Sequence, residues 1–167
     1  MRRRFGKLIN ELAKKDEKVV LLVGDIGYGI FDDFRKENPR KFFNLGICEQ
    51  SMISFASGMA LEGLKPWVYT ITPFLIERPF EQIKLDIDQQ NVNVNLVGFA
   101  DYPTLGPTHS EINGKALMKL FDNITSFFPK NGEETEMMTN IAYNNNGPAF
   151  ISIKSDPNLA RSITGQK

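Results

Sequence analysis

Short, uniformly apolar runs that alternate with longer amphipathic segments are the feature that most restricts the fold of this chain. The run VVLLVG at 19–24 has no polar alternation, which is typical of a strand covered on both faces. Similar strand-like runs lie at 42–45, 67–71, 93–99, 125–128 and 148–153. Helix-like segments precede or separate them, at 5–16, 49–62, 75–90, 111–121 and 133–144. This alternation predicts an α/β fold with a doubly wound, mostly parallel six-stranded sheet and helices on both faces.

Composition excludes several classes of protein. The 167 residues show no repeat or low-complexity tract, so we expect a single domain over 1–167. Lys plus Arg and Asp plus Glu are equal at 20 each, which leaves no basic surplus for nucleic acid. No apolar run is long enough for a membrane span, and the start lacks a signal-peptide core. One cysteine and one histidine cannot form a His/Cys metal cage, so we expect no metal site within this chain. A single cysteine also cannot form an internal disulfide, and we expect a reduced, cytoplasmic protein.

Ligands of a doubly wound sheet bind beyond the carboxyl ends of its strands, so the strand-to-helix loops are the places to search. The four such loops with polar residues are GDIGYG (24–29), GICEQ (46–50), TPFLIERPF (72–80) and ADYPTLGPTHSE (100–111). Neither GxGxxG nor GxxxxGK[ST] occurs, which disfavours a Rossmann dinucleotide site and a P-loop. GDIGYG suits either a phosphate-binding turn or a plain tight turn.

Glu49 is the one carboxylate at the start of a helix, EQSMISFASGMALEG, that is small and apolar around most of its circumference. Such a helix is expected to be buried on several sides. A glutamate in a first helical turn can simply cap free amides and meet the helix dipole. The residues by themselves leave a capping role and a chemical role both open.

Three segments in this order resemble the pyrimidine-binding domain of transketolases: NLGICEQSMISFASGMALEG (44–63), RPFEQI (78–83) and GPTH (106–109). The resemblance extends over about residues 19–155. It is weaker to deoxyxylulose-phosphate synthases and to the β subunits of 2-oxo acid dehydrogenases, which share the thiamine-diphosphate domain. The resemblance implies thiamine diphosphate as cofactor, with Glu49 bonded to N1′ of its aminopyrimidine. That contact favours the imino form of the 4′-amino group, which removes the C2 proton, and the apolar helix would supply the desolvation that proton sharing requires.

The same resemblance assigns further residues to the cofactor. Phe74 and Phe80 are the candidates for an aromatic bed under the pyrimidine, and ordinary core packing is the alternative for each. Asp25 matches an acidic residue near the cofactor or the domain interface, and a turn-stabilising aspartate is the alternative.

Substrate contacts are implied at His109 and Lys154. His109 falls in GPTH, where transketolases place a histidine that contacts the substrate. The family has Asp where this chain has Leu105, and its phosphate-contacting arginine aligns with Ser155, beside Lys154. A lysine binds phosphate as a point charge without the bidentate fork of arginine. The substrate would therefore be a sugar or sugar phosphate that is held in a different way, or another compound.

The motif that holds Mg²⁺ and the diphosphate in this superfamily, GDG followed by Asn, does not occur here. We therefore expect a separate partner chain that carries the diphosphate-binding domain and Mg²⁺, while the family's third, carboxyl-terminal domain is absent from this sequence. The apolar segments 49–62 and 74–87 are candidates for the contact, and a heterotetramer is the expected assembly.

Three classes of function remain compatible with the sequence. The first is the subunit of a split transketolase-like enzyme that transfers a two-carbon ketol unit from a ketose to an aldose. The second is the β-type component of a 2-oxo acid decarboxylating enzyme. The third is a degenerate binding module without catalytic activity, which Leu105 would favour.

Overall fold

The computed structural model describes residues 1–100, 106–110 and 113–155, and these form a single six-stranded sheet in the order β2-β1-β3-β4-β6-β5. Every pair of neighbouring strands is parallel, which confirms the predicted fold class. The strands are β1 (Val19–Val23), β2 (Phe42–Asn44), β3 (Lys65–Ile71), β4 (Asn95–Phe99), β5 (Thr125–Phe127) and β6 (Ala149–Ile153).

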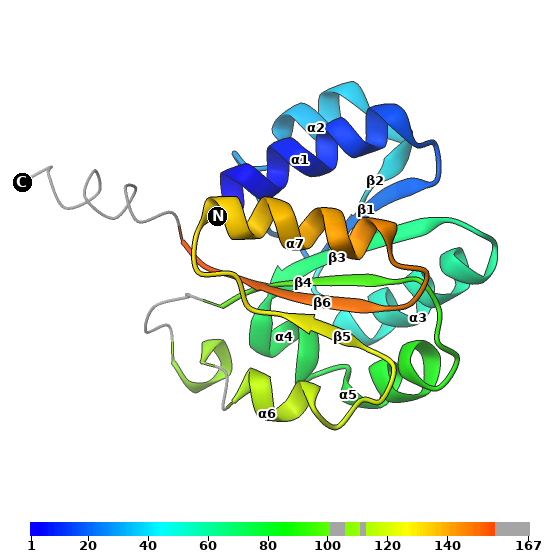
Figure 1. Cartoon of the computed structure of the whole chain (residues 1–167), viewed down its shortest axis with the longest axis vertical. Helices are drawn as coiled ribbons and strands as arrows, with labels where there is room; N and C mark the ends of the chain where they lie inside the picture. The colour runs from blue at the N-terminus through cyan, green and yellow to red at the C-terminus, as the bar shows by residue number, and fades with distance from the viewer. Residues whose placement is uncertain (101–105, 111–112, 156–167) are drawn as a thin grey trace, which may run out of the picture.

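Helices cover both faces of the sheet (Figure 1). On one face lie α1 (Arg2–Lys15), α2 (Asp32–Glu37) and α7 (Gly132–Asn144). On the other lie α3 (Glu49–Leu61), α4 (Thr72–Ile76), α5 (Phe80–Gln82), the π-helical segment η2 (Ile83–Asp88) and α6 (Gly114–Met118). Two short 3₁₀ turns complete the described elements, η1 (Pro39–Lys41) and η3 (Pro107–His109).

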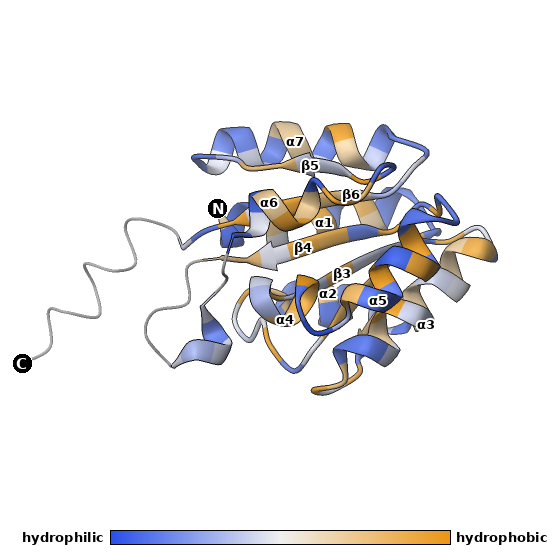
Figure 2. Ribbon diagram, turned by 90° about the horizontal axis from the view of Figure 1, so that it is seen from below, coloured by the Kyte–Doolittle hydropathy of each residue, from blue (hydrophilic) through white to orange (hydrophobic). Residues whose placement is uncertain are grey.

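Alternate strand residues feed two separate hydrophobic cores, because successive side chains of a strand point to opposite faces. Leu21 and Val97 belong to the core under α1, whereas Leu22 and Leu96 belong to the core under α3. Each fully buried side chain of this kind contributes about 1.5–3 kcal/mol of transfer free energy. Figure 2 shows these mostly hydrophobic strands between the two helix layers. The two cores explain why the strands have no polar face.

The expected helix at 75–90 is divided into α4, a turn, α5 and η2. Pro79 is the physical reason, because proline lacks a backbone N–H and disfavours helical geometry in the residue before it. Arg78 lies in the turn at this break, between α4 and α5. The segment at 111–121 is also shorter than expected: α6 begins after Asn113, whose side chain accepts a hydrogen bond from the Ala116 amide, and residues 111–112 lie outside the described part.

Other elements agree with the sequence within a few residues, except that the sequence pattern does not predict α2. The segment DDFRKE contains a single buried side chain, Phe34, so it has no apolar periodicity to detect. By contrast, α7 carries a clear start signal. The Asn131 side chain accepts from the Glu134 amide, and the Glu134 carboxylate accepts from the Lys130 amide.

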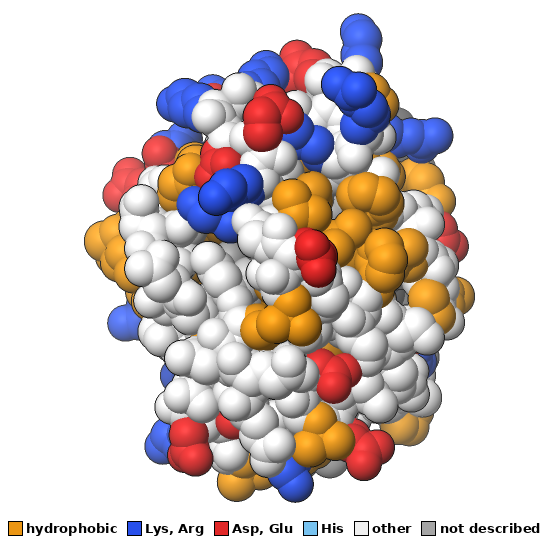
Figure 3. Space-filling view, turned by 90° about the vertical axis from the view of Figure 1, so that its right-hand side faces the viewer, with side chains coloured by type: hydrophobic (Ala, Val, Ile, Leu, Met, Phe, Trp, Pro, Cys, Tyr) orange, Lys and Arg blue, Asp and Glu red, His pale blue; other side chains and the backbone are white. Residues whose placement is uncertain are grey.

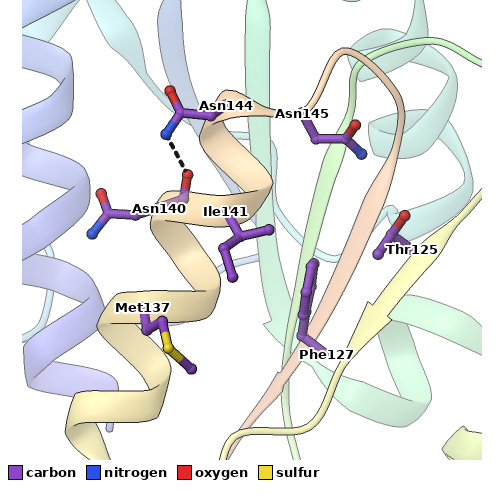
Figure 4. Close-up of a pocket in the computed structure, with 7 residues that line it drawn as sticks. All are labelled: Thr125, Phe127, Met137, Asn140, Ile141, Asn144 and Asn145. Carbon is purple, nitrogen blue, oxygen red and sulfur yellow. Dashed lines mark hydrogen bonds between the residues drawn. The ribbon is translucent and has the colours of Figure 1, made fainter.

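Strand β5 is an edge of the sheet, and a groove of about 740 Å³ separates it from α7. Figure 4 shows Phe127 on the strand side of this groove and Met137 and Ile141 on the helix side. On α7, the Asn144 side chain donates a hydrogen bond to the backbone oxygen of Asn140. This groove lies beside the edge strand, whereas the candidate site lies at the carboxyl ends of β1 and β3.

Candidate functional site

The chain reverses its direction of travel across the sheet between β1 and β3. It moves outward from β1 to β2, returns past β1 to form β3, and then continues to β4. Such a reversal leaves a crevice beyond the carboxyl ends of the two strands, which is where open α/β sheets bind ligands. The loop that begins at Gly24 and helix α4, which begins at Thr72, border this crevice, and α3 starts next to it.

Glu49 opens α3 and is buried, with only 2% of the residue exposed. Nη1 of Arg78 donates to its Oε1 at 3.1 Å and to its Oε2 at 3.2 Å. Within the described part of the chain, the hydrogen bonds of this carboxylate come from Arg78, and none comes from a backbone amide. Its place in the first turn of α3 still puts it near the positive end of the helix dipole, so that part of the structural alternative remains. The carboxylate is therefore buried and paired with a cation that is itself partly exposed.

Arg78 connects Glu49 to two other candidate residues. The Arg78 guanidinium carbon lies 3.6 Å from the centre of the Phe74 ring. The Phe74 ring also contacts His109, with ring centres 4.8 Å apart and planes at 65°. Cation–π and edge-to-face contacts of this kind contribute about 0.5–2 kcal/mol each. Glu49, Arg78, Phe74 and His109 thus form a continuous row, which we call the Glu49 row.

Phe80 lies elsewhere. Its ring packs 5.1 Å from that of Phe121 and against the core that contains Met52. Among the described residues, its ring contact is with this core and not with the Glu49 row. The proposed role of Phe80 under the pyrimidine stays a prediction. Its observed packing is what ordinary core packing, the alternative role, would require.

Asp25 lies in the loop after β1 with a left-handed backbone, φ 52°. Its carboxylate accepts from Asn44 Nδ2 at 3.2 Å and from the Tyr28 hydroxyl at 2.9 Å, and its own amide donates to Asn44 Oδ1. These bonds, Asn44 first and Tyr28 second, hold the pKa of Asp25 below its ordinary value. Asn44 also accepts from the Gly46 amide. The Asp25–Asn44 pair therefore ties the first two strand-to-helix loops together.

Lys154 follows β6 and lines a different cavity, together with Ala100, which follows β4, and with residues from α6 and the loop after β5. His109 does not line that cavity. The two residues predicted to bind substrate thus belong to neighbouring but separate parts of the same sheet edge.

The described part of the chain offers no cluster of three or more His, Cys, Asp or Glu side chains that could hold a metal ion. None of its helices is long and apolar enough to cross a bilayer.

Residues 1–156 match the transketolase pyrimidine-binding domain family, and the chain belongs to that family. An apulose-4-phosphate transketolase subunit of Actinobacillus succinogenes is 38% identical over 72% of this chain and 40% of the relative. A 1-deoxy-D-xylulose-5-phosphate synthase of Clostridium perfringens is 37% identical over 88% of this chain and 24% of the relative. The chain therefore spans well under half the length of these relatives.

Solved structures agree with this assignment. A structure described as a split gene transketolase, inactive beta4 tetramer, superposes with a TM-score of 0.84 at 30% identity and covers 93% of this chain and 51% of that one. Transketolase of Campylobacter jejuni has the same fold, with a TM-score of 0.79 at 21% identity, over 92% of this chain and 25% of that one.

Two residues of the site carry no role in the sequence interpretation. Arg78 falls within RPFEQI, and an arginine shortly after the mostly apolar run TPFLI is a signal that could have singled it out. Asn44 ends β2, and a polar residue at the carboxyl end of a strand is the kind of position where ligands bind.

Proposed function

We propose that this chain is the pyrimidine-binding subunit of a split, thiamine-diphosphate-dependent transketolase-like enzyme. The observation that carries the proposal is the buried carboxylate of Glu49 at the crevice between β1 and β3, which Arg78 links to the ring of Phe74. The reaction proposed is transfer of a two-carbon ketol unit from a ketose donor to an aldose acceptor.

The residues present fit an aminopyrimidine. Glu49 provides a carboxylate and Phe74 provides a ring face, which are the two groups that such a ring needs for hydrogen bonding and stacking. When bound, thiamine diphosphate supplies the carbanion chemistry that splits the bond next to a ketose carbonyl. Glu49 would hold a proton at the pyrimidine nitrogen, and Phe74 would fix the ring plane.

Arg78 must move away from Glu49 before this carboxylate can bond to the pyrimidine nitrogen, because Nη1 of Arg78 donates to both carboxylate oxygens. The Arg78 side chain is 35% exposed, so water can take over its bonds when it moves. We propose that cofactor binding displaces Arg78 both from Glu49 and from the face of the Phe74 ring, which the pyrimidine then covers.

Mg²⁺ and the diphosphate would be held by a separate chain that carries the family's GDG motif, in a heterotetramer of two copies of each chain. The surface of α3 supports this proposal. Phe55 and Leu61 are 46% and 62% exposed, and Ser51, Ser54 and Gly58 on the same helical face are also exposed. Figure 3 shows hydrophobic side chains gathered on the side of the molecule at the right of Figure 1, where α3 ends. The related structure described as an inactive beta4 tetramer suggests that such chains also associate without a partner.

The test uses titration calorimetry of thiamine diphosphate with Mg²⁺ into the chain alone and into its mixture with a diphosphate-domain chain. We expect binding only in the mixture, and ketol transfer by that mixture. Glu49→Gln should abolish turnover and leave assembly intact, whereas Glu11→Gln, exposed on α1 on the opposite face of the sheet, should leave both unchanged. Unaltered turnover with Glu49→Gln would refute the proposed role of this carboxylate.

A decarboxylating reaction is the second candidate, because a deoxyxylulose-phosphate synthase is about as similar to this chain as a transketolase subunit. The discriminating measurement supplies the active mixture with a 2-oxo acid or with a ketose as donor. Release of CO₂ from the 2-oxo acid would favour decarboxylation. Aldose-dependent consumption of the ketose without CO₂ would favour ketol transfer.

A further inference from the structure

The outer edge of strand β5 presents open backbone groups. β5 ends the six-stranded sheet and pairs with β6 on its inner side. The Thr125 amide donates to the Pro148 carbonyl at 3.1 Å, so Thr125 and, by alternation, Phe127 direct their backbone groups toward β6. The N–H and C=O of Ser126, which lies between them, therefore point away from the sheet. Ser126 offers one donor and one acceptor to another strand.

The two edges of the sheet differ in their protection. Charged side chains and prolines at an edge discourage pairing with another chain. The other edge strand, β2, directly follows the turn η1, in which Pro39 and Arg40 are exposed. The segment ITSFF at 124–128, which contains β5, has neither a charge nor a proline. The β5 edge is therefore the one that can accept a further strand.

The groove beside β5 is apolar and uncharged. Phe127 lies on its strand side, and Met137 and Ile141 lie on its helix side, one turn of α7 apart (Figure 4). These two side chains belong to residues that are 52% and 49% exposed. The lining residues are Thr125, Phe127, Met137, Asn140, Ile141, Asn144 and Asn145, and none of them is charged, although 24% of the chain is. Two identical copies of this surface can approach each other without repulsion between like charges.

We infer that two copies of this chain associate through their β5 strands, which pair antiparallel about a two-fold axis beside Ser126. In this arrangement the two Ser126 residues exchange both N–H···O bonds, as opposed residues of a hydrogen-bonded antiparallel pair do. The two sheets become continuous, and the two α7 helices lie on the same face of the joined sheet. Met137 and Ile141 of one copy then face the same residues of the other across the axis, as an isologous contact requires.

The charges at the two ends of the strand support this register. With Ser126 on the axis, Asp122 lies toward Lys130 of the second copy, because each is four residues from Ser126 in opposite directions. Both residues are exposed, and within the described part of the chain neither side chain has an ion pair. Ile124 lies opposite Phe128 in the same way. Opposite charges and apolar side chains thus meet across the edge, which stabilises antiparallel strands.

This contact is separate from the one proposed on α3. α3 packs on β3, whereas β5 lies at the far edge of the sheet, beyond β4 and β6. The inference therefore does not depend on the proposed function, and the failure of either leaves the other standing.

The first experiment measures hydrogen exchange of single amides in the full chain by NMR, from micromolar to near-millimolar concentration. The Ser126 amide should exchange about tenfold more slowly in the dimer, because its N–H then bonds to the second copy. The Phe127 amide bonds to β6 in either state and is the internal control, whose rate should stay constant. Sedimentation of the same samples should show a species of twice the 18.9 kDa mass of one chain. A monomer at every concentration would overturn the inference, as would a dimer with unchanged exchange at Ser126.

An exchange of charges tests the register and the identity of the occupant. Asp122→Lys and Lys130→Asp should each weaken dimerisation about tenfold at low ionic strength, because each places like charges opposite one another. The variant with both substitutions should recover the affinity. Asp33→Lys, exposed on α2, is the matched control and should change nothing. Ile141→Lys should abolish the dimer, whereas Leu61→Lys, on the exposed face of α3, should not.

Two results of this series would contradict the inference. Weaker association in both single charge variants without recovery in the combined variant would mean that the edge meets a different occupant or register. Loss of the dimer through the α3 substitution, but not through the α7 substitution, would place the contact on α3.

Discussion

A single nitrogen of Arg78 donates to both carboxylate oxygens of Glu49, at 3.1 and 3.2 Å, across 29 residues of sequence. The arginine comes from the turn between α4 and α5, and the glutamate comes from the first turn of α3. Glu49 is almost fully buried, while the Arg78 side chain is about one-third exposed. The pair therefore joins a desolvated anion to a cation that keeps access to water.

This asymmetry predicts unequal effects of removing either partner. Arg78→Met leaves a buried carboxylate without its partner and should lower the free energy of unfolding by about 1–2 kcal/mol at pH 7, less than for a fully buried pair. Glu49→Gln should cost less, because Arg78 turns to water. Urea unfolding of both variants and the double variant should give a coupling energy of about 1 kcal/mol. The exposed pair Lys14–Glu37 serves as control and should couple by less than about 0.5 kcal/mol. Equal coupling in the two pairs would contradict this interpretation.

Gly58 provides a test of α3 as an interface. A Cβ at this position meets no atom within 4 Å, and the residue lies on the exposed face of the helix. Gly58→Ala should stabilise the isolated chain by about 0.5–1 kcal/mol through helix propensity. If a second chain packs on this face, the added methyl should weaken association, which sedimentation at several concentrations would measure. Higher stability with unchanged association would place the interface elsewhere.

Gly98 should respond to alanine in the opposite direction. Its Cβ would lie 2.5 Å from Thr72 Oγ1 and 3.2 Å from both the Thr72 Cα and Phe150 Cε2. Since Thr72 begins α4, the clash would displace the helix that carries Phe74. Gly98→Ala should lower the free energy of unfolding by about 1–3 kcal/mol, as overpacking does. A neutral result in thermal unfolding would mean that α4 moves freely.

Substitutions of Phe74 and Phe80 should affect different properties, cofactor affinity for Phe74 and stability for Phe80. Phe80→Ala removes a ring packed against Phe121 and should lower stability by about 1–3 kcal/mol, since the site is only partly buried. Phe74→Ala should change stability less but weaken thiamine diphosphate binding in the mixture with the partner chain. Calorimetry that shows the larger loss of cofactor affinity for Phe80→Ala would reverse this assignment.

Asp25 predicts a pH dependence. Bonds from Asn44 and Tyr28 lower its pKa in the folded chain. A carboxylate with a lowered folded pKa stabilises the fold fully above its unfolded pKa, about 3.9, and this contribution disappears as pH falls through the lower folded value. The difference in unfolding free energy between the native chain and Asp25→Ala should therefore be constant from pH 7 to about 5 and shrink below about pH 4. A difference that grows on acidification would contradict the proposed network.

Sequence alone determined the parallel α/β sheet and the position of Glu49, because both follow from local patterns. Uniform apolar runs require strands buried on both faces, and a small, apolar helix that opens with a carboxylate is readable within one segment. The break in the expected helix at 75–90 also has a local cause, Pro79. The apolar spacing of this segment nevertheless predicted one continuous helix.

Only the tertiary structure decided which side chains meet. The Arg78–Glu49 pair and the Asp25–Asn44 bridge each join residues from separate segments of the chain. The order of strands in the sheet brings them together, and no local pattern records that order. Contacts between side chains so far apart in the sequence depend on the packing of helices on both faces of the sheet. They therefore form only when both hydrophobic cores are packed.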